Sequence, residues 1–350
     1  MRKAGVLVVV LLLLATAGGA VYRLHRAFYG AGPSAEVVRI EVEPGTSVRG
    51  ALAKLAKGGV IESPRAVEIY LRLRGQHPQL KAGTYEISPR ASPAKIIRQL
   101  EEGAVLLEQL TVVEGSTFAQ LRAALQQHPA VVATLRGKSD ADLMIAIGQA
   151  GQQPEGRFFP DTYRFAARTT DVEILKLAYG KMQRLLQAAW RDRLGGLPIR
   201  TPEEALTLAS IVEKETALAS ERARIAGVFI ARLRKGMRLQ SDPTVIYGLG
   251  ERYDGDIRTR DLSADTLYNT YTRAGLPPTP IALPGRDSIY AAVRPDETGA
   301  LFFVATGDGT GAHYFSKTLG EHNEAVKRYL ARLNKQAGAA PRKSKSSGGL

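Results

Sequence analysis

Two glutamates near the middle of the sequence are the residues best placed for acid–base chemistry. They end a nearly apolar segment, Leu208-Ala-Ser-Ile-Val-Glu213-Lys-Glu-Thr216. Burial raises the pKa of a carboxyl group because desolvation disfavours its charged form. A carboxylic acid that is still protonated near neutral pH can donate a proton to the oxygen of a glycosidic bond. The segment therefore predicts a general acid.

A helix must position these glutamates. Thr201-Pro-Glu-Glu204 predicts its start, with Thr201 as N-cap and a proline in the first turn. Glu215 lies about 200° further round such a helix than Glu213, so the two are not expected to work as a pair on one bond. Both have apolar neighbours, and periodicity does not choose between them. The structural alternative for Glu213 is a salt bridge at the helix end, to Lys214, Arg222 or Arg224.

A second helix and a polar segment follow. Residues 220–235 carry apolar side chains on one helical face, and Gly236 is expected to close this helix. The segment from Met237 to Gly248 predicts a loop with groups that suit sugar hydroxyls and an N-acetyl group, namely Gln240, Asp242, Thr244 and Tyr247. The alternatives are structural: a turn role for Asp242 before a proline, and a place in the core or at its rim for the tyrosines 247, 268 and 271.

These segments, together with several others, resemble the YceG-like (MltG-type) endolytic murein transglycosylases. The resemblance covers about residues 36–334 and the N-terminal apolar segment. Its blocks are Glu155-Gly, Phe159-Pro-Asp-Thr162, Glu213-Lys-Glu-Thr216, Ser220-Glu-Arg222, Met237-Arg-Leu-Gln-Ser-Asp-Pro-Thr-Val-Ile-Tyr-Gly248, Tyr268-Asn-Thr-Tyr271, Gly275-Leu-Pro-Pro278, Pro284-Gly285, His313-Tyr-Phe-Ser316 and Glu321-His-Asn323. The sequence departs from the family pattern at Leu283, where a small polar residue is expected.

The resemblance implies roles for individual residues. The catalytic acid of the family is the first glutamate of the Glu-Lys-Glu-Thr motif, which is Glu213 here. Substrate contacts are expected at Glu155, Gln240, Asp242, Thr244, Tyr247, Asn269 and Tyr271. The departure at Leu283 weakens any expectation that this position contacts substrate, and it leaves the glutamate untouched.

The implied activity is that of a lytic transglycosylase acting within peptidoglycan glycan strands. Glu213 would protonate the oxygen of the β-1,4 bond between N-acetylmuramic acid and N-acetylglucosamine, and would then take the proton of the muramoyl 6-hydroxyl. The product is a 1,6-anhydro end, and the resemblance implies that cleavage of nascent strands terminates their elongation. Two alternatives stay open: a muramidase that uses Asp242 or another acid as second carboxylate, and a non-catalytic glycan-binding scaffold that organises synthesis enzymes.

Composition narrows the function classes. The chain has 350 residues, of which 44% are hydrophobic, enough for two or three domains with a sizeable core. It has no cysteine, which excludes disulfides and thiolate metal sites. The five histidines are scattered without paired ligand spacing, so we expect no metal and no cofactor. The net charge of +14 suits an anionic membrane surface or an acidic polymer, and no nucleic-acid motif points to a nucleic-acid partner.

The N-terminus predicts a membrane anchor. Residues 4–22 form an uncharged run of 19 residues, which reaches about 28 Å as a helix and can span a hydrocarbon core. Arg2 and Lys3 precede the run, which favours a cytoplasmic N-terminus with the rest of the chain outside the cytoplasm. The family resemblance implies that the membrane is the inner membrane and that the catalytic part lies in the periplasm. Arg23 and Arg26 follow the run directly and mildly oppose this orientation. A cleaved signal peptide is the alternative, since small residues such as Ala15-Thr-Ala17 offer a cleavage site.

The expected fold is α+β. We predict a cytoplasmic N-terminus (1–3), a transmembrane helix (4–22), a linker (23–35), a small LysM-like α/β domain (36–105), a larger, mainly helical catalytic domain with some strands (106–336), and a disordered basic tail (337–350). The small domain resembles a LysM module, which holds glycan, although a strand–turn–helix unit is a common arrangement in any case. The expected partners are peptidoglycan strands and membrane lipid, with peptidoglycan synthases (penicillin-binding proteins) as candidate protein partners.

Overall fold

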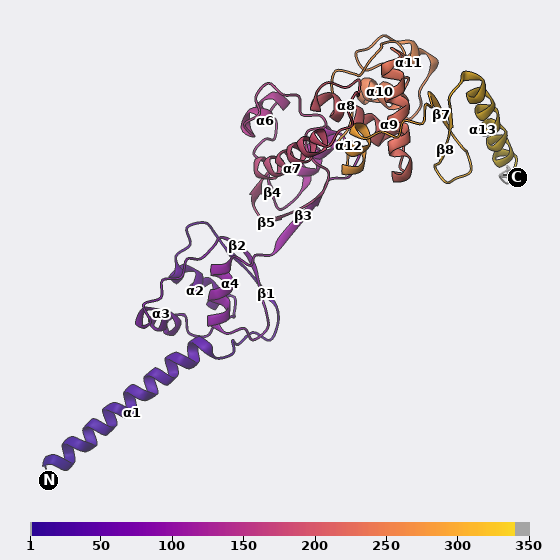
Figure 1. The fold of residues 1–350 in the computed structure, drawn as a ribbon. Helices are drawn as coiled ribbons and strands as arrows, with labels where there is room; N and C mark the ends of the chain where they lie inside the picture. Colours follow the sequence, from indigo (N-terminus) through magenta and orange to yellow (C-terminus); the bar gives the residue numbers. More distant parts are fainter. Residues whose placement is uncertain (1, 340–350) are drawn as a thin grey trace, which may run out of the picture. The chain divides into compact units, whose positions relative to one another are not determined.

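The computed structural model describes residues 2–339, and it describes side chains for residues 6–335. The chain divides into two compact units, which are described separately here (Figure 1). The first unit contains the residues up to 109, with 129–132 and 164–169, and the second contains 110–128, 133–163 and the residues from 170 onward. The first unit is therefore not the single stretch 36–105 expected of the small domain.

The first unit is a long helix followed by a small α/β fold. Its elements are α1 (Arg2–Tyr29), β1 (Val38–Val42), α2 (Val48–Lys57), α3 (Pro64–Leu73), β2 (Gly83–Ile87) and α4 (Pro93–Glu102). The two strands pair antiparallel, with Val38 opposite Ile87 and Val42 opposite Gly83. Alternate residues of each strand are buried, because successive side chains of a strand point to opposite faces. Tyr85 and Ile87 of β2 share one core with apolar residues of α2, α3 and α4.

The end of α1 differs from the expected linker at 23–35. The helix continues through Tyr29, and Phe28 is buried in the core of the first unit. The Phe28 ring stacks on Tyr70 of α3, with ring centroids 4.4 Å apart. Residues 23–29 contain neither glycine nor proline, so nothing breaks the helix before Gly30. The apolar helix is thus joined to the small fold by packed helix.

The second unit is mainly helical. Its longer helices are α5 (Phe118–Gln127), α7 (Asp171–Arg191), α8 (Pro202–Glu215), α9 (Ala219–Arg234), α10 (Asp242–Leu249), α12 (Arg286–Val293) and α13 (Leu319–Ala339). Shorter turns of helix are α6 (Asp140–Ala146), α11 (Thr259–Ser263) and the 3₁₀ turn η1 (Gly250–Arg252). The predicted disordered tail begins inside α13, since 337–339 are helical, and its remainder, 340–350, lies outside the described residues.

Short strand pairs complete the fold. Besides the β1–β2 pair, β3 (Leu107–Thr111) pairs with β5 (Thr162–Ala166), and β4 (Val131–Val132) pairs with β6 (Thr169–Thr170). β7 (Phe302–Ala305) and β8 (His313–Ser316) form an antiparallel hairpin beside α13 (Figure 1).

Helix α8 is the centre of the second unit. Every residue from Ala205 to Val212 is buried, on all sides of the helix. Helices α7, α9 and α12 pack around it, and they contribute most of the remaining core. A helix that is apolar on every side must be enclosed by its neighbours. The enclosure ends at the last turn of α8, where the two glutamates lie.

Candidate active site

The start of α8 fixes where its last turn falls. The Thr201 hydroxyl accepts a hydrogen bond from the Glu204 N–H (3.2 Å), and Pro202 occupies the first turn, as the sequence predicts. The helix then runs to Glu215, and Thr216 has an extended backbone that ends it. Because both ends are held, Glu213 is placed at a fixed position in the final turn.

Glu213 is almost fully enclosed and held by two donors. Its side chain is 5% exposed. Oε1 accepts a hydrogen bond from Arg222 Nη2 at 3.2 Å, and Oε2 accepts one from the Gly285 N–H at 2.9 Å. The salt bridge to Arg222 that the sequence allowed as an alternative is therefore present. Both contacts stabilise a carboxylate and fix its orientation.

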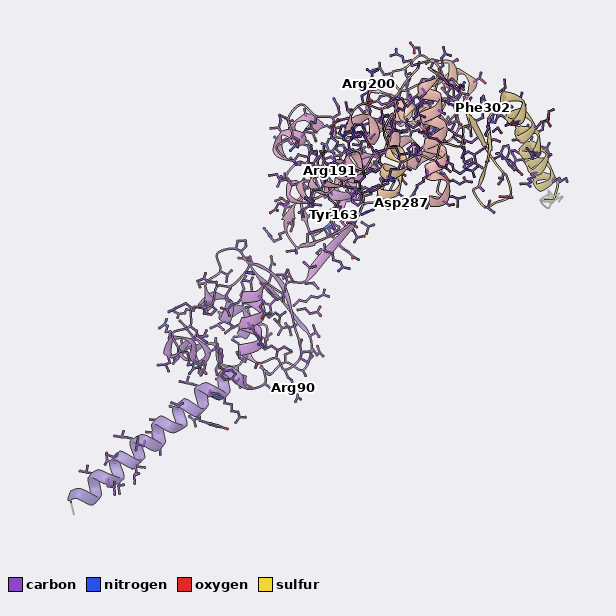
Figure 2. The ribbon with its side chains drawn as sticks, in the orientation of Figure 1. Arg90, Tyr163, Arg191, Arg200, Asp287 and Phe302 are labelled. Carbon is purple, nitrogen blue, oxygen red and sulfur yellow. The ribbon has the colours of Figure 1, made fainter. Side chains whose placement is uncertain are left out.

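Arg222 gathers three carboxylates. Besides Glu213, its guanidinium lies 3.4 Å from Asp287 Oδ2 and 3.7 Å from Glu114 Oε2. Asp287, labelled in Figure 2, lies at the start of α12 and is more exposed than the other members. Burial raises the pKa of Glu114, and the negative charge of Glu213 adds to this effect. A single buried cation is thus shared by three acids from three parts of the chain.

A pocket opens at this cluster. It has a volume of about 390 Å³ and is lined by Glu114, Gly115, Glu213, Lys214, Glu215, Thr216, Ala217 and Arg222. Two backbone hydrogen bonds connect the segments beside the pocket. The Gly115 N–H donates to the Leu283 oxygen (2.9 Å), and the Leu283 N–H donates to the Ser116 oxygen (2.7 Å). Lys214 Nζ also donates to the Gly115 oxygen (3.1 Å). The backbone N–H and oxygen of Leu283 are therefore both hydrogen-bonded to other residues of the protein.

Gly285 is required at its position by a close approach. A Cβ on this residue would lie 2.0 Å from Oε1 of Glu114, well inside contact distance. We expect Gly285→Ala to push the Glu114 carboxylate aside and to disturb the N–H that holds Glu213. Activity on glycan strands should fall about tenfold or more, since small displacements at a reacting centre are costly. The melting temperature should change little, because the displaced group is the end of a flexible side chain.

The matched control for Gly285→Ala removes the clash. In a Glu114→Ala background the added methyl group has room, so Gly285→Ala should then cost little beyond Glu114→Ala alone. Equal losses in the two backgrounds, measured as initial rates on purified protein, would show that the close contact with Glu114 is not the cause.

Glu215 has a separate set of partners. Ser241 Oγ donates a hydrogen bond to Glu215 Oε1, and the charges of Asp242 and Arg232 act on it in opposite directions. Burial raises the pKa of Glu215 to about 7. Within the described residues, Glu213 and Glu215 share no hydrogen-bond partner, as expected from their rotation around the helix, although both line the same pocket. A raised pKa, predicted from burial for this segment, is thus present at Glu215.

The segment after α9 is helical from Asp242, where the sequence predicts a loop to Gly248. α10 begins with Pro243 in its first turn, and proline is well tolerated there. Gln240, just before it, has the left-handed φ of 52°, which is uncommon for a residue other than glycine. The Gln240 N–H donates to the Thr270 oxygen at 3.1 Å, and its Oε1 lies 3.5 Å from Arg232 Nη1.

Two of the expected substrate contacts have their polar groups engaged inside the protein. Thr244 is fully buried, and its hydroxyl donates to the Ser241 oxygen at 2.7 Å. Asn269 is 1% exposed, and its Nδ2 donates to three backbone oxygens of the 261–264 turn. Tyr271 and Asp242 are more open, and the Tyr271 hydroxyl donates to Asp242 Oδ1 at 2.6 Å.

Glu155 and Tyr247 meet at a second pocket. This pocket has a volume of about 740 Å³ and lies beside the start of α5. Glu155 is 7% exposed; its Oε1 accepts from the Phe118 N–H (2.9 Å), and its Oε2 accepts from the Tyr247 hydroxyl (3.1 Å). Burial raises the pKa of Glu155 to about 7 and also raises that of Tyr247. Both carboxylate oxygens are occupied, so Glu155 secures the start of α5.

The two buried glutamates predict a pH dependence of stability. Burial raises the pKa values of Glu155 and Glu215 from 4.5 to about 7. Between these values the folded protein holds protons that the unfolded chain releases, so the free energy of unfolding should fall as pH rises from about 4.5 to about 7. The expected loss is on the order of a few kcal/mol. Urea unfolding across this range measures it, and the double variant Glu155→Gln, Glu215→Gln should show a flatter profile. A wild-type stability that rises through this window contradicts the prediction.

Sequence reasoning missed Glu114 and Asp287. The segment Val113-Glu-Gly-Ser-Thr117 is similar to Val42-Glu-Pro-Gly-Thr-Ser47, but this similarity suggests a repeated strand–turn–helix unit of the LysM-like kind and does not point to an active site. Gly285 was visible as part of the Pro284-Gly285 block, without its role as the donor to Glu213. These residues are close to Glu213 only because α12 and the 113–116 segment pack against the end of α8.

The chain is similar to known proteins over most of its length. The model of the YceG-like family matches residues 40–328. An endolytic murein transglycosylase of Bacillus subtilis strain 168 is 32% identical over 320 residues, covering 87% of this chain and 88% of that protein. An endolytic murein transglycosylase of Streptococcus pneumoniae is 27% identical over 335 residues, and the match spans 86% of this chain and 60% of that longer protein.

A solved structure shows the same fold. The crystal structure of a YceG-like protein from Listeria monocytogenes superposes with a TM-score of 0.53 at 32% identity, covering 83% of this chain and all but 1% of the other. The family match extends over most of the chain, and its range includes Arg222 and the three acids beside it, Glu114, Glu213 and Asp287. The chain therefore belongs to the YceG-like family.

Proposed function

We propose that this protein is a lytic transglycosylase that cleaves within the glycan strands of peptidoglycan, with Glu213 as its catalytic acid and base. The observation that carries the proposal is the enclosed Glu213 carboxylate, oriented by Arg222 and the Gly285 N–H at the edge of a pocket. The names of the curated relatives support the same reaction and substrate.

The reaction needs one group that first gives and then takes a proton. Protonated Glu213 donates its proton to the bridging oxygen as the bond from that oxygen to C1 of N-acetylmuramic acid breaks. The Glu213 carboxylate then takes the proton of the muramoyl 6-hydroxyl, whose oxygen forms the new bond to C1. The product carries a 1,6-anhydro ring, no water is consumed, and Glu213 returns to its starting protonation state. Arg222 and the Gly285 N–H hold the carboxylate form that acts as base.

The cluster around Arg222 also suits the acid stage. Glu114 and Asp287 compete with Glu213 for the single guanidinium, so its charge is not devoted to Glu213 alone. The negative charge of these neighbours favours protonation of one member of the group. Burial and the negative charge of Glu213 raise the pKa of Glu114, so Glu114 is the member that can hold a proton beside Glu213.

Hydrolysis of the same glycosidic bond is the alternative reaction, and the structure bears on which second carboxylate it would use. A muramidase needs a second carboxylate near the acid. Asp242 accepts a hydrogen bond from Tyr271, and its charge acts on Glu215. Glu114 and Asp287, in contrast, share Arg222 with Glu213. If hydrolysis occurred, Glu114 and Asp287 would therefore be better candidates for the second carboxylate than Asp242.

Mass analysis of digested glycan strands tests the proposal. A lytic transglycosylase releases fragments that end in 1,6-anhydromuramic acid, each lighter by one water than the corresponding hydrolysis product. Internal cleavage should shorten long strands early in the digest. Reducing muramic ends would identify a muramidase, and no cleavage by folded protein would favour a glycan-binding scaffold.

We further propose that α1 anchors the protein in the inner membrane, with a cytoplasmic N-terminus and both folded units in the periplasm. The helix from Val6 to Tyr29 is long and apolar enough to cross a membrane. In this setting the small α/β unit is a LysM-like module that holds nascent strands. Cleavage there would terminate strand elongation, next to the peptidoglycan synthases that are candidate partners.

The anchor predicts a specific fractionation. Full-length protein should sediment with membranes and resist washes with salt and carbonate, because an apolar helix of this length leaves the bilayer only with detergent. Protease added from outside the cytoplasmic membrane should reach the folded units. Recovery of a soluble form that begins near Ala20 or later would instead identify a cleaved signal peptide.

A further inference from the structure

A groove lies where α1 enters the first unit. It has a volume of about 1110 Å³ and is formed by the last turns of α1, the segment after it, and the start of α3. α1 packs on α3 and α4, and Figure 1 shows α3 beside the end of α1. None of the residues of the Glu213 cluster lines this groove.

The groove changes in character along α1. Gly19 and Ala20 of the uncharged run line it with small apolar groups, Leu24 adds an apolar side chain at the level of the arginines, and Ile69 of α3 extends this apolar surface. Arg23 and Arg26 line it just beyond the run. Both arginines are exposed, and within residues 2–339 neither is part of an ion pair. Glu62 is the one acidic residue of the lining, so arginine charge prevails.

The neighbouring face of α3 also carries exposed apolar and basic side chains. Ile69 and Leu73 lie one turn apart on this helix and are 48% and 72% exposed. Arg65 and Arg72 flank them at helical spacing, and Arg72 is paired with Glu68 at 2.8 Å. Large apolar side chains between basic ones, on a helix packed beside a membrane span, are typical of a surface that lies in the headgroup region.

We infer that this groove binds an anionic phospholipid. Its phosphate would lie between Arg23 and Arg26, and one acyl chain would run along Ala20 and Leu24 into the bilayer. The inference rests on the proposed anchor, which sets the groove at the level of the headgroups. It also accounts for two arginines on the side of the span where positive charge is disfavoured.

The lipid has a mechanical role in this arrangement. Phe28 already ties α1 to the core of the first unit, so a headgroup held by Arg23 and Arg26 would fix that unit at the membrane surface. The apolar α3 face, with Ile69 and Leu73, would then rest on the same leaflet. A substrate-binding unit held in this way meets strands that are still close to the membrane.

Native mass spectrometry of the full chain tests the inference. The detergent-purified protein is mixed with equal amounts of phosphatidylglycerol and phosphatidylcholine, and lipid that stays bound is counted. One phosphatidylglycerol should be retained about tenfold or more over phosphatidylcholine, given the contribution of a basic residue near an anionic headgroup. Arg23→Gln, Arg26→Gln should abolish this preference, and Ile69→Ser should lower retention of both lipids.

The control variant removes the same charge elsewhere. Arg49 and Arg98 are exposed on the first unit and outside the groove, so Arg49→Gln, Arg98→Gln should keep the preference for phosphatidylglycerol. Equal retention of the two lipids by the wild type would overturn the inference. So would an unchanged preference in Arg23→Gln, Arg26→Gln, or a lipid-free dimer, which would assign the groove to a second copy of the chain. Failure of the anchor proposal is seen separately, as soluble protein in the fractionation.

Discussion

Glu213→Gln is expected to lose activity by a factor of at least about 10² to 10⁴, the usual contribution of a positioned acid or base. The amide can still accept a hydrogen bond from the Gly285 N–H, but it can neither give nor take the proton that the reaction moves. The measurement is the rate of appearance of 1,6-anhydro ends from purified glycan strands, with substrate in excess.

The variant should stay folded. Removal of the Glu213 charge leaves Arg222 with Asp287 and Glu114 as counter-charges, so the buried guanidinium is not left unpaired. Circular dichroism and thermal unfolding close to those of the wild type would establish this, and they are needed before a loss of rate is assigned to chemistry.

Glu215→Gln is the matched control, since it makes the same change two residues away in the same helix. Glu215 has its own partner in Ser241 and shares no donor with Glu213, so its substitution should cost much less in rate. A Glu213→Gln protein with full activity would falsify the assignment. A larger loss in Glu215→Gln than in Glu213→Gln would move the acid to Glu215, whose pKa burial raises to about 7.

The sequence predicted the helices better than their surroundings. The helix predicted to start at Thr201 is α8, and the helix predicted over residues 220–235 is α9, which runs from Ala219 to Arg234. Helix caps and amphipathic patterns depend on residues only a few positions apart, so they can be recognised in the sequence without the tertiary structure. The linker after residue 22 failed as a prediction because burial of Phe28 against α3 depends on a distant segment.

The residues of the candidate active site could likewise be predicted only where the signal is local in the sequence. Glu213 could be singled out because its helix is apolar and its motif is specific. Glu114 precedes it by about a hundred residues and Gly285 follows it by more than seventy, and neither lies in a pattern that names a partner. Thr244 and Asn269 were expected at the substrate because polar residues suit sugars, yet their polar groups serve internal turns. Which polar residues face a pocket is decided by packing.

Arg222→Met is expected to cause the largest loss of stability among single changes in the cluster. Arg222 is 9% exposed, and the Glu213 side chain against it is 5% exposed. Breaking a buried pair by removal of one partner costs roughly 3–5 kcal/mol, because the other charge stays buried without compensation. Urea unfolding at neutral pH measures the change. Activity should fall as well, since Glu213 keeps only the Gly285 N–H to orient it.

Two further variants separate the causes of that loss. Arg234→Met removes an arginine from the same helix, but its partner Glu297 is 40% exposed, so the cost should stay within about 1 kcal/mol. The double variant Glu213→Gln, Arg222→Met lacks the buried carboxylate, and the remaining partners Glu114 and Asp287 are exposed, so part of the stability lost in Arg222→Met should return. If the two substitutions were simply additive, the penalty would come from lost packing of the arginine stem. The pair of charges at the end of α8 would then matter for catalysis and not for the fold.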